Sequence, residues 1–244
     1  MNISVEDFAS KKLKILQDKE SFCFGIDAVL LSDFVKIRRM EKTLDLGTGT
    51  GVIPLLLASS YADNCFTGLE IQEDAVNLAR KSVSLNSLDG RVEIVHGDLK
   101  NAPDIFGKNT FDVVTSNPPY IRETHGKSSD SDKVAFARRE ILCTLSDVVK
   151  AAATLLKSDG RFYMIHRPER LAEIIVEFSK KRLEAKRLRF VHPKAGAAPT
   201  MLLIEGRKNA KPGLLVEKPL VVYSADGNYT EEVALIYGKQ ISSI

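Results

Sequence analysis

The sequence of 244 residues lacks the features of a membrane protein, of a secreted protein and of a metal-binding protein. No stretch approaches the roughly 20 consecutive apolar residues that span a bilayer. The first residues, MNISVED, lack the basic and apolar regions of a secretory signal peptide. The three cysteines, Cys23, Cys65 and Cys143, lie far apart and match no metal-ligand spacing. We therefore expect buried thiols in a reducing cytoplasm, no metal and no membrane contact.

What is present is the composition of a globular protein with an uneven distribution of charge. Hydrophobic residues make up 44% of the chain and charged residues 27%, which suits one large α/β domain. The net charge is only +3, but ten acidic and five basic residues give residues 43–120 a charge of −5, whereas residues 180–218 carry +8. An acidic centre followed by a basic C-terminal third indicates a polyanion that docks beside a site.

Apolar runs and helical patterns alternate regularly from residue 43 onward. Strands are predicted at 43–46, 65–71, 91–96 and 111–116, and helices at 52–60 and 72–86. Such alternation is typical of βαβ units, so the sequence predicts an α/β fold with a mostly parallel sheet.

The remaining elements are predicted from shorter patterns. The polar stretch 122–135 predicts a long loop because it contains little to bury. Helix 139–156 is predicted to end at Ser158-Asp159-Gly160, and the tail to hold a turn and a short helix. The other predicted elements are strands at 12–17, 161–165, 187–191 and 200–205, and helices at 27–36 and 169–181.

A glycine loop separates the first strand of the regular region from its helix, in LDLGTGTGVIPLLLA (44–58). Gly47, Gly49 and Gly51 permit positive φ and leave no side chain between backbone and ligand, and the helix that follows presents free N–H groups. The spacing differs from the dinucleotide-binding pattern G-x-G-x-x-G, and no Lys-Ser/Thr pair follows as in a P-loop. The loop therefore predicts a ligand site of another kind.

Two carboxylates follow the next two strands. Glu70 ends the second strand, where its carboxylate can accept hydrogen bonds from two ribose hydroxyls. Asp98 ends the third strand, in HGDLK, where it can accept from an adenine amino group. Ligands of open α/β sheets bind at the carboxyl ends of strands, so both acids are candidates for nucleoside binding.

The fourth strand runs directly into Asn117-Pro118-Pro119-Tyr120. An exocyclic amine on a conjugated ring is a poor nucleophile because its lone pair is delocalised into the ring. The Asn117 amide oxygen and the Pro118 carbonyl can accept its two hydrogens and direct the lone pair at an electrophile, while the prolines keep that carbonyl rigid. Tyr120 offers a face for stacking. The tetrapeptide therefore predicts a catalytic site for a planar, conjugated nitrogen.

Together, these motifs resemble those of the class I S-adenosylmethionine-dependent methyltransferases, over roughly residues 22–205. The segment from Asp45 to Gly51 resembles their first motif, Glu70 their ribose-binding acid and Asp98 their adenine contact. The resemblance implies a Rossmann-like fold with helices on both faces of the sheet and an antiparallel strand near the C-terminus. It also implies S-adenosylmethionine as the cofactor.

The same resemblance assigns further residues and divides the chain. Ile71 and Leu99 would flank the adenine ring of the cofactor, and Asn117 would lie beside both cofactor and target. We expect a single domain, with an N-terminal extension and lid helix at 1–40, a catalytic core at 41–206 and a tail at 207–244.

The tetrapeptide itself resembles that of enzymes that methylate adenine N6, guanine N2 or a glutamine side-chain amide. The segment FCFGIDAVLLSDFV (22–35) resembles bacterial methyltransferases that modify adenine N6 next to the anticodon of a valine tRNA. In that group Gly25 and Asp27 would border the methionine end of the cofactor. Two later segments resemble the same group: VHP (191–193) with the small-residue turn that follows it, and KPGLLVEKPLVVY (211–223) in the tail. Glutamine methyltransferases usually carry an N-terminal helical domain, whereas only about 40 residues precede this glycine loop.

We therefore expect an N6-adenine methyltransferase that acts on the anticodon loop of tRNA in the cytoplasm, with a monomer favoured. Guanine-N2 methylation of ribosomal RNA and glutamine-amide methylation of a protein stay as alternatives. The glycine spacing disfavours an NAD-dependent oxidoreductase, and the intact cofactor positions disfavour a non-catalytic RNA-binding module. RNA phosphates are expected to contact basic residues of the C-terminal third, namely Lys180, Lys181, Arg182, Lys186, Arg187, Arg189 and Lys194.

Overall fold

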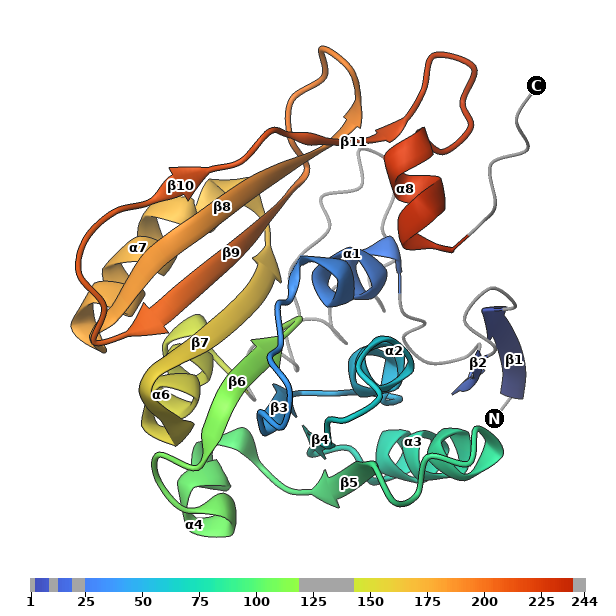
Figure 1. The fold of residues 1–244 in the computed structure, drawn as a ribbon, viewed down its shortest axis with the longest axis vertical. Helices are drawn as coiled ribbons and strands as arrows, with labels where there is room; N and C mark the ends of the chain where they lie inside the picture. The colour runs from blue at the N-terminus through green and yellow to red at the C-terminus, as the bar shows by residue number, and fades with distance from the viewer. Residues whose placement is uncertain (1–2, 9–12, 19–24, 119–142, 239–244) are drawn as a thin grey trace, which may run out of the picture.

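The computed structural model describes residues 3–8, 13–18, 25–118 and 143–238. A mixed sheet runs through the centre, and a separate hairpin of β1 (Ile3–Phe8) and β2 (Leu13–Asp18) packs beside α3 (Figure 1). Within these residues, no helix combines the length and the apolar character needed to cross a bilayer.

Five parallel strands form the body of the sheet, in the spatial order β5, β4, β3, β6 and β7. β9 lies antiparallel between β7 and β8, and the short strands β10 and β11 pair with β8. This arrangement confirms the predicted α/β fold with its antiparallel strand near the C-terminus. The strands are β3 (Thr43–Leu46), β4 (Phe66–Glu70), β5 (Val92–His96), β6 (Phe111–Ser116), β7 (Leu156–His166), β8 (Leu183–Lys194), β9 (Met201–Lys208), β10 (Leu215–Val216) and β11 (Leu220–Tyr223).

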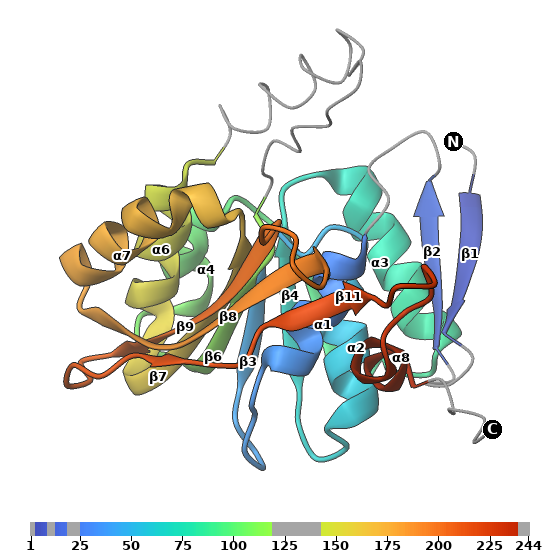
Figure 2. The same ribbon diagram turned by 90° about the horizontal axis from the view of Figure 1, so that it is seen from above.

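Helices cover both faces of the sheet, as Figure 2 shows from above. One face carries α1 (Ile26–Phe34), α2 (Val52–Ser60) and α3 (Glu73–Leu85). The other carries α4 (Ala102–Phe106), α6 (Leu145–Leu155) and α7 (Leu171–Lys180). The 3-10 turns η2 (Leu99–Asn101) and η3 (Pro168–Arg170) and the short helix α8 (Glu231–Ile236) complete the fold.

Alternating side chains of the inner strands supply both halves of the core. In β6, Val113 packs toward α1 and α2, whereas its neighbour Val114 packs toward α6. In β7, Tyr163 packs on the side of α1 and α2, and Phe162 packs on the side of α6. All four side chains are completely buried, and burying a Val or Phe side chain contributes about 1.5–3 kcal/mol. Apolar residues on both faces explain why these strands read as continuous hydrophobic runs.

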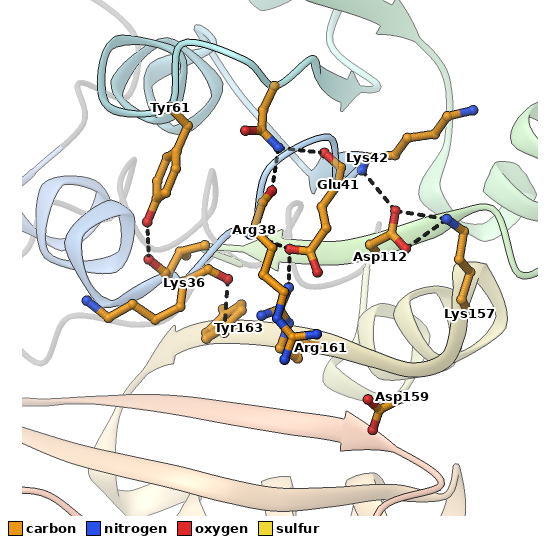
Figure 3. Close-up of polar contacts among 12 residues, drawn as sticks. Lys36, Arg38, Glu41, Lys42, Tyr61, Asp112, Lys157, Asp159, Arg161 and Tyr163 are labelled. Atoms are coloured by element: carbon orange, nitrogen blue, oxygen red, sulfur yellow. Dashed lines mark hydrogen bonds and ion pairs between the residues drawn. The ribbon is translucent and has the colours of Figure 1, made fainter.

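Polar contacts close the amino edge of the sheet, where the parallel strands begin (Figure 3). Lys157 Nζ donates to the two carboxylate oxygens of Asp112 at 2.7 and 2.8 Å, and the Lys42 N–H donates to the same group at 2.9 Å. Partial burial disfavours the charged carboxylate, but these hydrogen bonds lower the pKa of Asp112 below its usual value. Arg161 of β7 pairs with Glu41, just before β3. These contacts join the starts of β3, β6 and β7.

The helix predicted at 139–156 is observed as α6 from Leu145 to Leu155, with Cys143 and Thr144 preceding it, and the residues expected to stop it belong to a strand. α6 ends at Leu155, and Ser158–Gly160 lie in β7. A Cβ atom on Gly160 would meet the carbonyl oxygens of Lys157 at 2.9 Å and Asp112 at 3.2 Å. The glycine thus permits close approach of β7 to β6 and does not cap the helix.

Other predictions in the outer parts of the chain need correction or stay open. β8 is longer than the predicted strand 187–191, and β1, β10 and β11 were not predicted at all. Cys65 is exposed, so the expectation of a buried thiol is wrong there. The predicted loop 122–135 lies outside the described residues. The division of the domain at residues 40 and 206 stays a prediction.

Candidate active site

The glycine loop connects β3 to α2 at the carboxyl edge of the sheet. Gly47, Gly49 and Gly51 have φ values of 70°, 55° and 80°, which only glycine adopts without strain. A Cβ atom on Gly47 or Gly49 would meet nothing within 4 Å, whereas one on Gly51 would lie 3.1 Å from the Ala79 Cβ. The first two glycines therefore border open space that a ligand can fill, and the third allows the loop to pack on α3.

Glu70 holds this loop from the end of β4. The side chain is buried, and its Oε2 accepts a hydrogen bond from the Gly49 N–H at 2.9 Å. Its Oε1 accepts from the Ile71 and Gln72 N–H groups at 3.0 and 2.9 Å. Three backbone donors orient the carboxylate, and its remaining lone pairs are available to hydroxyl groups of a ligand.

Asp45 lies beside Glu70 within the sheet and keeps one unused acceptor. Its Oδ1 accepts a hydrogen bond from the Thr115 hydroxyl at 2.6 Å, and its Oδ2 has no partner among the described residues. Burial raises the pKa of Asp45 to about 7; the Thr115 hydrogen bond and the nearby Thr48 hydroxyl oppose this rise, and the charge of Glu70 adds to it. A buried acceptor without a donor is costly, so Oδ2 suits a site completed by a ligand that carries N–H groups.

The end of β6 places Asn117 two residues beyond Thr115, the register partner of Asp45. The Ser116 hydroxyl donates to the Leu46 carbonyl at 2.9 Å, which joins the ends of β6 and β3. The Asn117 Oδ1 is buried and has no hydrogen-bond partner within the described parts of the chain. Pro118, which follows, is buried. Pro119 and Tyr120 lie outside the described residues, so their roles stay predictions.

Asp98 and its neighbours lie at the next strand end. Asp98 caps η2, with its Oδ1 accepting from the Lys100 N–H at 2.9 Å. Leu99 is partly buried, and Ile71, after β4, is 39% exposed. The Ile71 carbonyl forms a 2.9 Å hydrogen bond with the His96 ring, which links the ends of β4 and β5.

The start of α1 supplies the remaining predicted cofactor residues. Asp27 is buried, and its Oδ1 accepts hydrogen bonds from the backbone N–H groups of Gly25 at 3.1 Å and Ala28 at 3.0 Å. The carboxylate therefore fixes the first turn of the helix.

Because β6, β3, β4 and β5 are neighbours, their ends bring Asn117, the glycine loop, Glu70 and Asp98 into one row. Sequence reasoning placed all of these at strand ends but missed Thr115, which orients Asp45. A threonine two residues before Asn117, on a strand next to that of Asp45, was the available signal. The cofactor and catalytic roles of these residues stay predictions.

The predicted RNA-binding residues are not brought together. Lys180, Lys181 and Arg182 precede β8 at the amino edge of the sheet, whereas Lys194 ends β8 at the carboxyl edge. The eleven steps of that strand separate the two groups by about 35 Å at roughly 3.3 Å per residue.

Several of these basic residues also have partners within the protein. Lys180 pairs with Glu177 at 2.7 Å, and the Lys186 ammonium donates to the Lys211 carbonyl at 3.2 Å. Arg189 pairs with Glu232 at 2.6 Å, and Arg187 pairs with Glu217 at 2.6 Å and Glu205 at 3.2 Å. Their predicted role as phosphate contacts stays a prediction, and the pairs make it less favourable for the two arginines.

Comparison with known proteins identifies the family. The model of the methyltransferase small domain matches residues 24–191. The chain belongs to this family. The methyltransferase is 31% identical over 228 residues to the tRNA1(Val) (adenine(37)-N6)-methyltransferase of Bacteroides thetaiotaomicron, a match that covers 92% of each chain. It is 29% identical to the enzyme of the same name from Actinobacillus pleuropneumoniae strain L20, with 93% of each chain covered.

Solved structures support the fold. A predicted O-methyltransferase from Agrobacterium tumefaciens superposes with a TM-score of 0.72 at 22% identity, over 88% of this chain and 98% of that one. A geranyl diphosphate C-methyltransferase from Streptomyces coelicolor, solved with S-adenosyl-L-homocysteine, gives 0.54 at 12% identity, over 74% and 76% of the two chains. The prediction of a class I methyltransferase that uses S-adenosylmethionine is confirmed.

Proposed function

We propose that this methyltransferase transfers a methyl group to the exocyclic N6 of an adenine in the anticodon loop of a tRNA. The observation that carries the proposal is the unpartnered Asn117 Oδ1 at the end of β6, in a chain that aligns along 92% of its length with an enzyme named for this reaction. We expect the cytoplasm as the place of action and a monomer as the active form.

The residues of the carboxyl edge fit S-adenosylmethionine, which supplies the activated methyl group when bound. Glu70 would accept the ribose hydroxyls, and Asp98 the adenine amino group, with Ile71 and Leu99 at the faces of that ring. The unused Asp45 Oδ2 suits the ammonium of the methionine part. The open space beside Gly47 and Gly49 would let the same part of the cofactor approach the backbone of the glycine loop. Gly25 and Asp27 would border the methionine end.

Asn117 and Pro118 would act on the target nitrogen. The amide oxygen of Asn117 and the Pro118 carbonyl accept the two amine hydrogens, which turns the lone pair away from the ring plane and toward the methyl donor. The interaction strengthens as the nitrogen gains positive charge, so it favours the transition state over the ground state. The proton can leave after transfer, and no strong general base is needed. Pro119 and Tyr120 would complete the pocket.

The RNA is expected to approach the carboxyl edge, because an extruded base must reach Asn117. A base in a loop is already partly unstacked, so it costs less to extrude than a base in a duplex, for which the cost is a few kcal/mol. Among the predicted RNA contacts, Lys194 lies at this edge. Lys180, Lys181 and Arg182 could contact only more distant parts of a large RNA.

One incubation separates this function from its alternatives. The protein is mixed with methyl-labelled S-adenosylmethionine and, separately, unmodified tRNA, ribosomal RNA and a release factor, and the labelled product is digested and identified. N6-methyladenosine in tRNA is the expected product. N2-methylguanosine in ribosomal RNA, or methylglutamine in the protein, would overturn the proposal in favour of one of the two alternatives.

A further inference from the structure

Four aromatic rings form a continuous column between the N-terminal hairpin and the C-terminal tail. The centroids of Phe8 and Tyr237 lie 6.1 Å apart, those of Tyr237 and Tyr229 5.2 Å, and those of Tyr229 and Tyr223 5.4 Å. The interplanar angles are 10°, 16° and 18°, so the rings are stacked nearly parallel. Nothing in the proposed methyl transfer uses this column.

The inner part of the column lies beside the candidate active site. Burial raises the pKa of the Tyr237 phenol, with further contributions from Tyr229 and from the charge of Asp27. Asp27 is the residue at the start of α1 that is expected to border the cofactor. Figure 1 likewise shows α8, which ends just before Tyr237, next to the start of α1. Two ring-to-ring steps of little more than 5 Å then lead from Tyr237 to Tyr223.

Tyr223 forms the outer end of the column and is 38% exposed. On one side it is bridged to Tyr229, and on the other it is the register partner of Lys194 in β8. Lys194 is exposed, and within the part of the chain that the structure describes its ammonium has neither a hydrogen bond nor an acidic partner. An aromatic ring and an uncompensated cation therefore stand side by side at the carboxyl edge of the sheet.

We propose that Tyr223 and Lys194 form a second nucleotide subsite, in which Tyr223 stacks a base of the RNA loop near the methylated adenine and Lys194 contacts its phosphate. This inference rests on the proposed function. Every base has a π face, so a ring of this kind holds an unstacked loop base whatever its sequence, and a lysine beside it supplies the phosphate contact. A base fixed here would help to hold the loop open while the target adenine enters the pocket at Asn117.

The surrounding charges limit the subsite to about one nucleotide. Asp226, in the turn after β11, accepts hydrogen bonds from the Asn228 N–H at 3.2 Å and from the Asn228 amide at 2.8 Å. Glu232 is paired with Arg189, and Glu231 is exposed at the start of α8. These carboxylates disfavour a phosphate backbone that continues along β11, so we expect the RNA to leave the surface past Tyr223.

The test combines protein variants with an anticodon stem-loop that carries a single abasic residue at each loop position in turn. Tyr223→Leu should raise the Kd and KM for the intact stem-loop about tenfold, with kcat at saturating RNA and cofactor affinity unchanged, whereas Tyr223→Phe should bind like the wild type. At one abasic position the affinity of the wild type should fall by the same factor of about ten, and the affinity of Tyr223→Leu should not fall any further.

Lys194→Ala should make the slope of log affinity against log salt less steep by about 0.7–0.9, the value for one phosphate contact. The control variant Lys108→Ala, which removes an exposed lysine before β6, should leave the slope unchanged. The proposal is overturned if Tyr223→Leu binds like the wild type, or if the loss from every abasic residue is the same in both proteins. If Tyr223→Leu melts early, the abasic scan of the wild type still tests the proposal, because a loss of affinity confined to the target adenine, with every other abasic stem-loop bound like the intact one, would overturn it. Failure of the proposed function looks different, because the wild type would then bind stem-loops without methylating adenine in any of them.

Discussion

Replacing Arg187 by alanine tests whether this residue stabilises the fold or contacts RNA. The guanidinium lies 4.2 Å above the centre of the Phe34 ring and donates to the Phe34 carbonyl at 3.3 Å, at the end of α1. It also pairs with Glu205 and Glu217, from β9 and the segment before β11. Four contacts to three separate parts of the chain leave 20% of the side chain exposed.

The expected loss of stability follows from the partner that is left behind. Glu205 is 6% exposed, and in Arg187→Ala it loses the cation that compensates its charge. Removing one member of a buried pair costs about 3–5 kcal/mol, and the partial exposure of Arg187 lowers our expectation to about 2–3 kcal/mol. For a chain of this size each kcal/mol lowers the Tm by about 2–4 °C, so we expect a fall of about 4–12 °C.

Three measurements on one variant give the answer: a thermal melt, a cofactor titration, and RNA binding across a salt series. The melt should move, the salt slope should not, and cofactor affinity should fall modestly because α1 carries Gly25 and Asp27 at its other end. Adding Glu205→Gln should restore part of the lost stability, since the buried charge is then removed. An unchanged Tm together with a shallower salt slope would refute this reasoning and restore Arg187 as a phosphate contact.

Three further substitutions probe the site and the sheet. Glu70→Ala should lower the affinity for S-adenosylmethionine at least tenfold in calorimetry, since each charge-assisted bond is worth about 1.5–3 kcal/mol; unchanged affinity would remove Glu70 from the site. The raised pKa of Asp45, about 7, means that the folded protein keeps a proton that the unfolded chain releases near pH 4, so the cofactor-free protein loses stability as the pH rises from about 4 to 7. The Tm of Asp45→Asn should therefore fall less between pH 5 and 8 than the Tm of the wild type, and parallel curves of Tm against pH would contradict this. Gly160→Ala should lower the Tm, because its Cβ atom would be overpacked against two carbonyl oxygens at a cost of about 1–3 kcal/mol. The control Gly90→Ala, whose Cβ atom would meet nothing within 4 Å, should leave the Tm unchanged. Equal Tm values for the two variants would contradict the prediction and show that β7 can shift to accept the methyl group.

The strands at the centre of the sheet were predictable because their local pattern and their burial agree. β3, α2 and β6 have the predicted bounds, β5 begins one residue later than predicted, and β4 is one residue shorter than predicted at each end. β3 and β6 are short apolar runs, buried on both faces, that stop at Gly47 and Asn117, so no competing pattern exists there. β5, at the edge of the sheet, instead alternates buried and exposed residues, which also predicts a strand. The positions of Glu70, Asp98 and Asn117 follow from those strand ends.

The outer strands were only partly predictable from local sequence: strands were predicted at 187–191, within β8, and at 200–205, which corresponds to β9. β8 carries a register shift between Ala185 and Arg187, which breaks the alternation of apolar and polar residues on which strand prediction depends. β10 has two residues and β11 has four, and both exist because they pair with β8. Such pairing is a tertiary property that no short window contains.

The net charge of the C-terminal third overstates how many of its cations lack an acidic partner, for a related reason. The sum of +8 over residues 180–218 counts each lysine and arginine alike. Arg189, however, pairs with Glu232, which lies outside that stretch, and Arg187 pairs with two acids inside it that are distant in sequence. The column of aromatic rings likewise joins residues from both ends of the chain, so its outer ring at Tyr223 became apparent only in the structure.

The rate of a single methyl transfer by Asn117→Ala tests the central claim most directly. The variant and the wild type are each saturated with labelled S-adenosylmethionine and an anticodon stem-loop, and the N6-methyladenosine formed is followed over one turnover. We expect the variant to be about 10²–10³ slower, by analogy with the loss of one preorganised hydrogen-bonding group, with cofactor affinity changed less than about twofold. A near-normal rate in Asn117→Ala, or label on any atom other than adenine N6 in the wild type, would contradict the account.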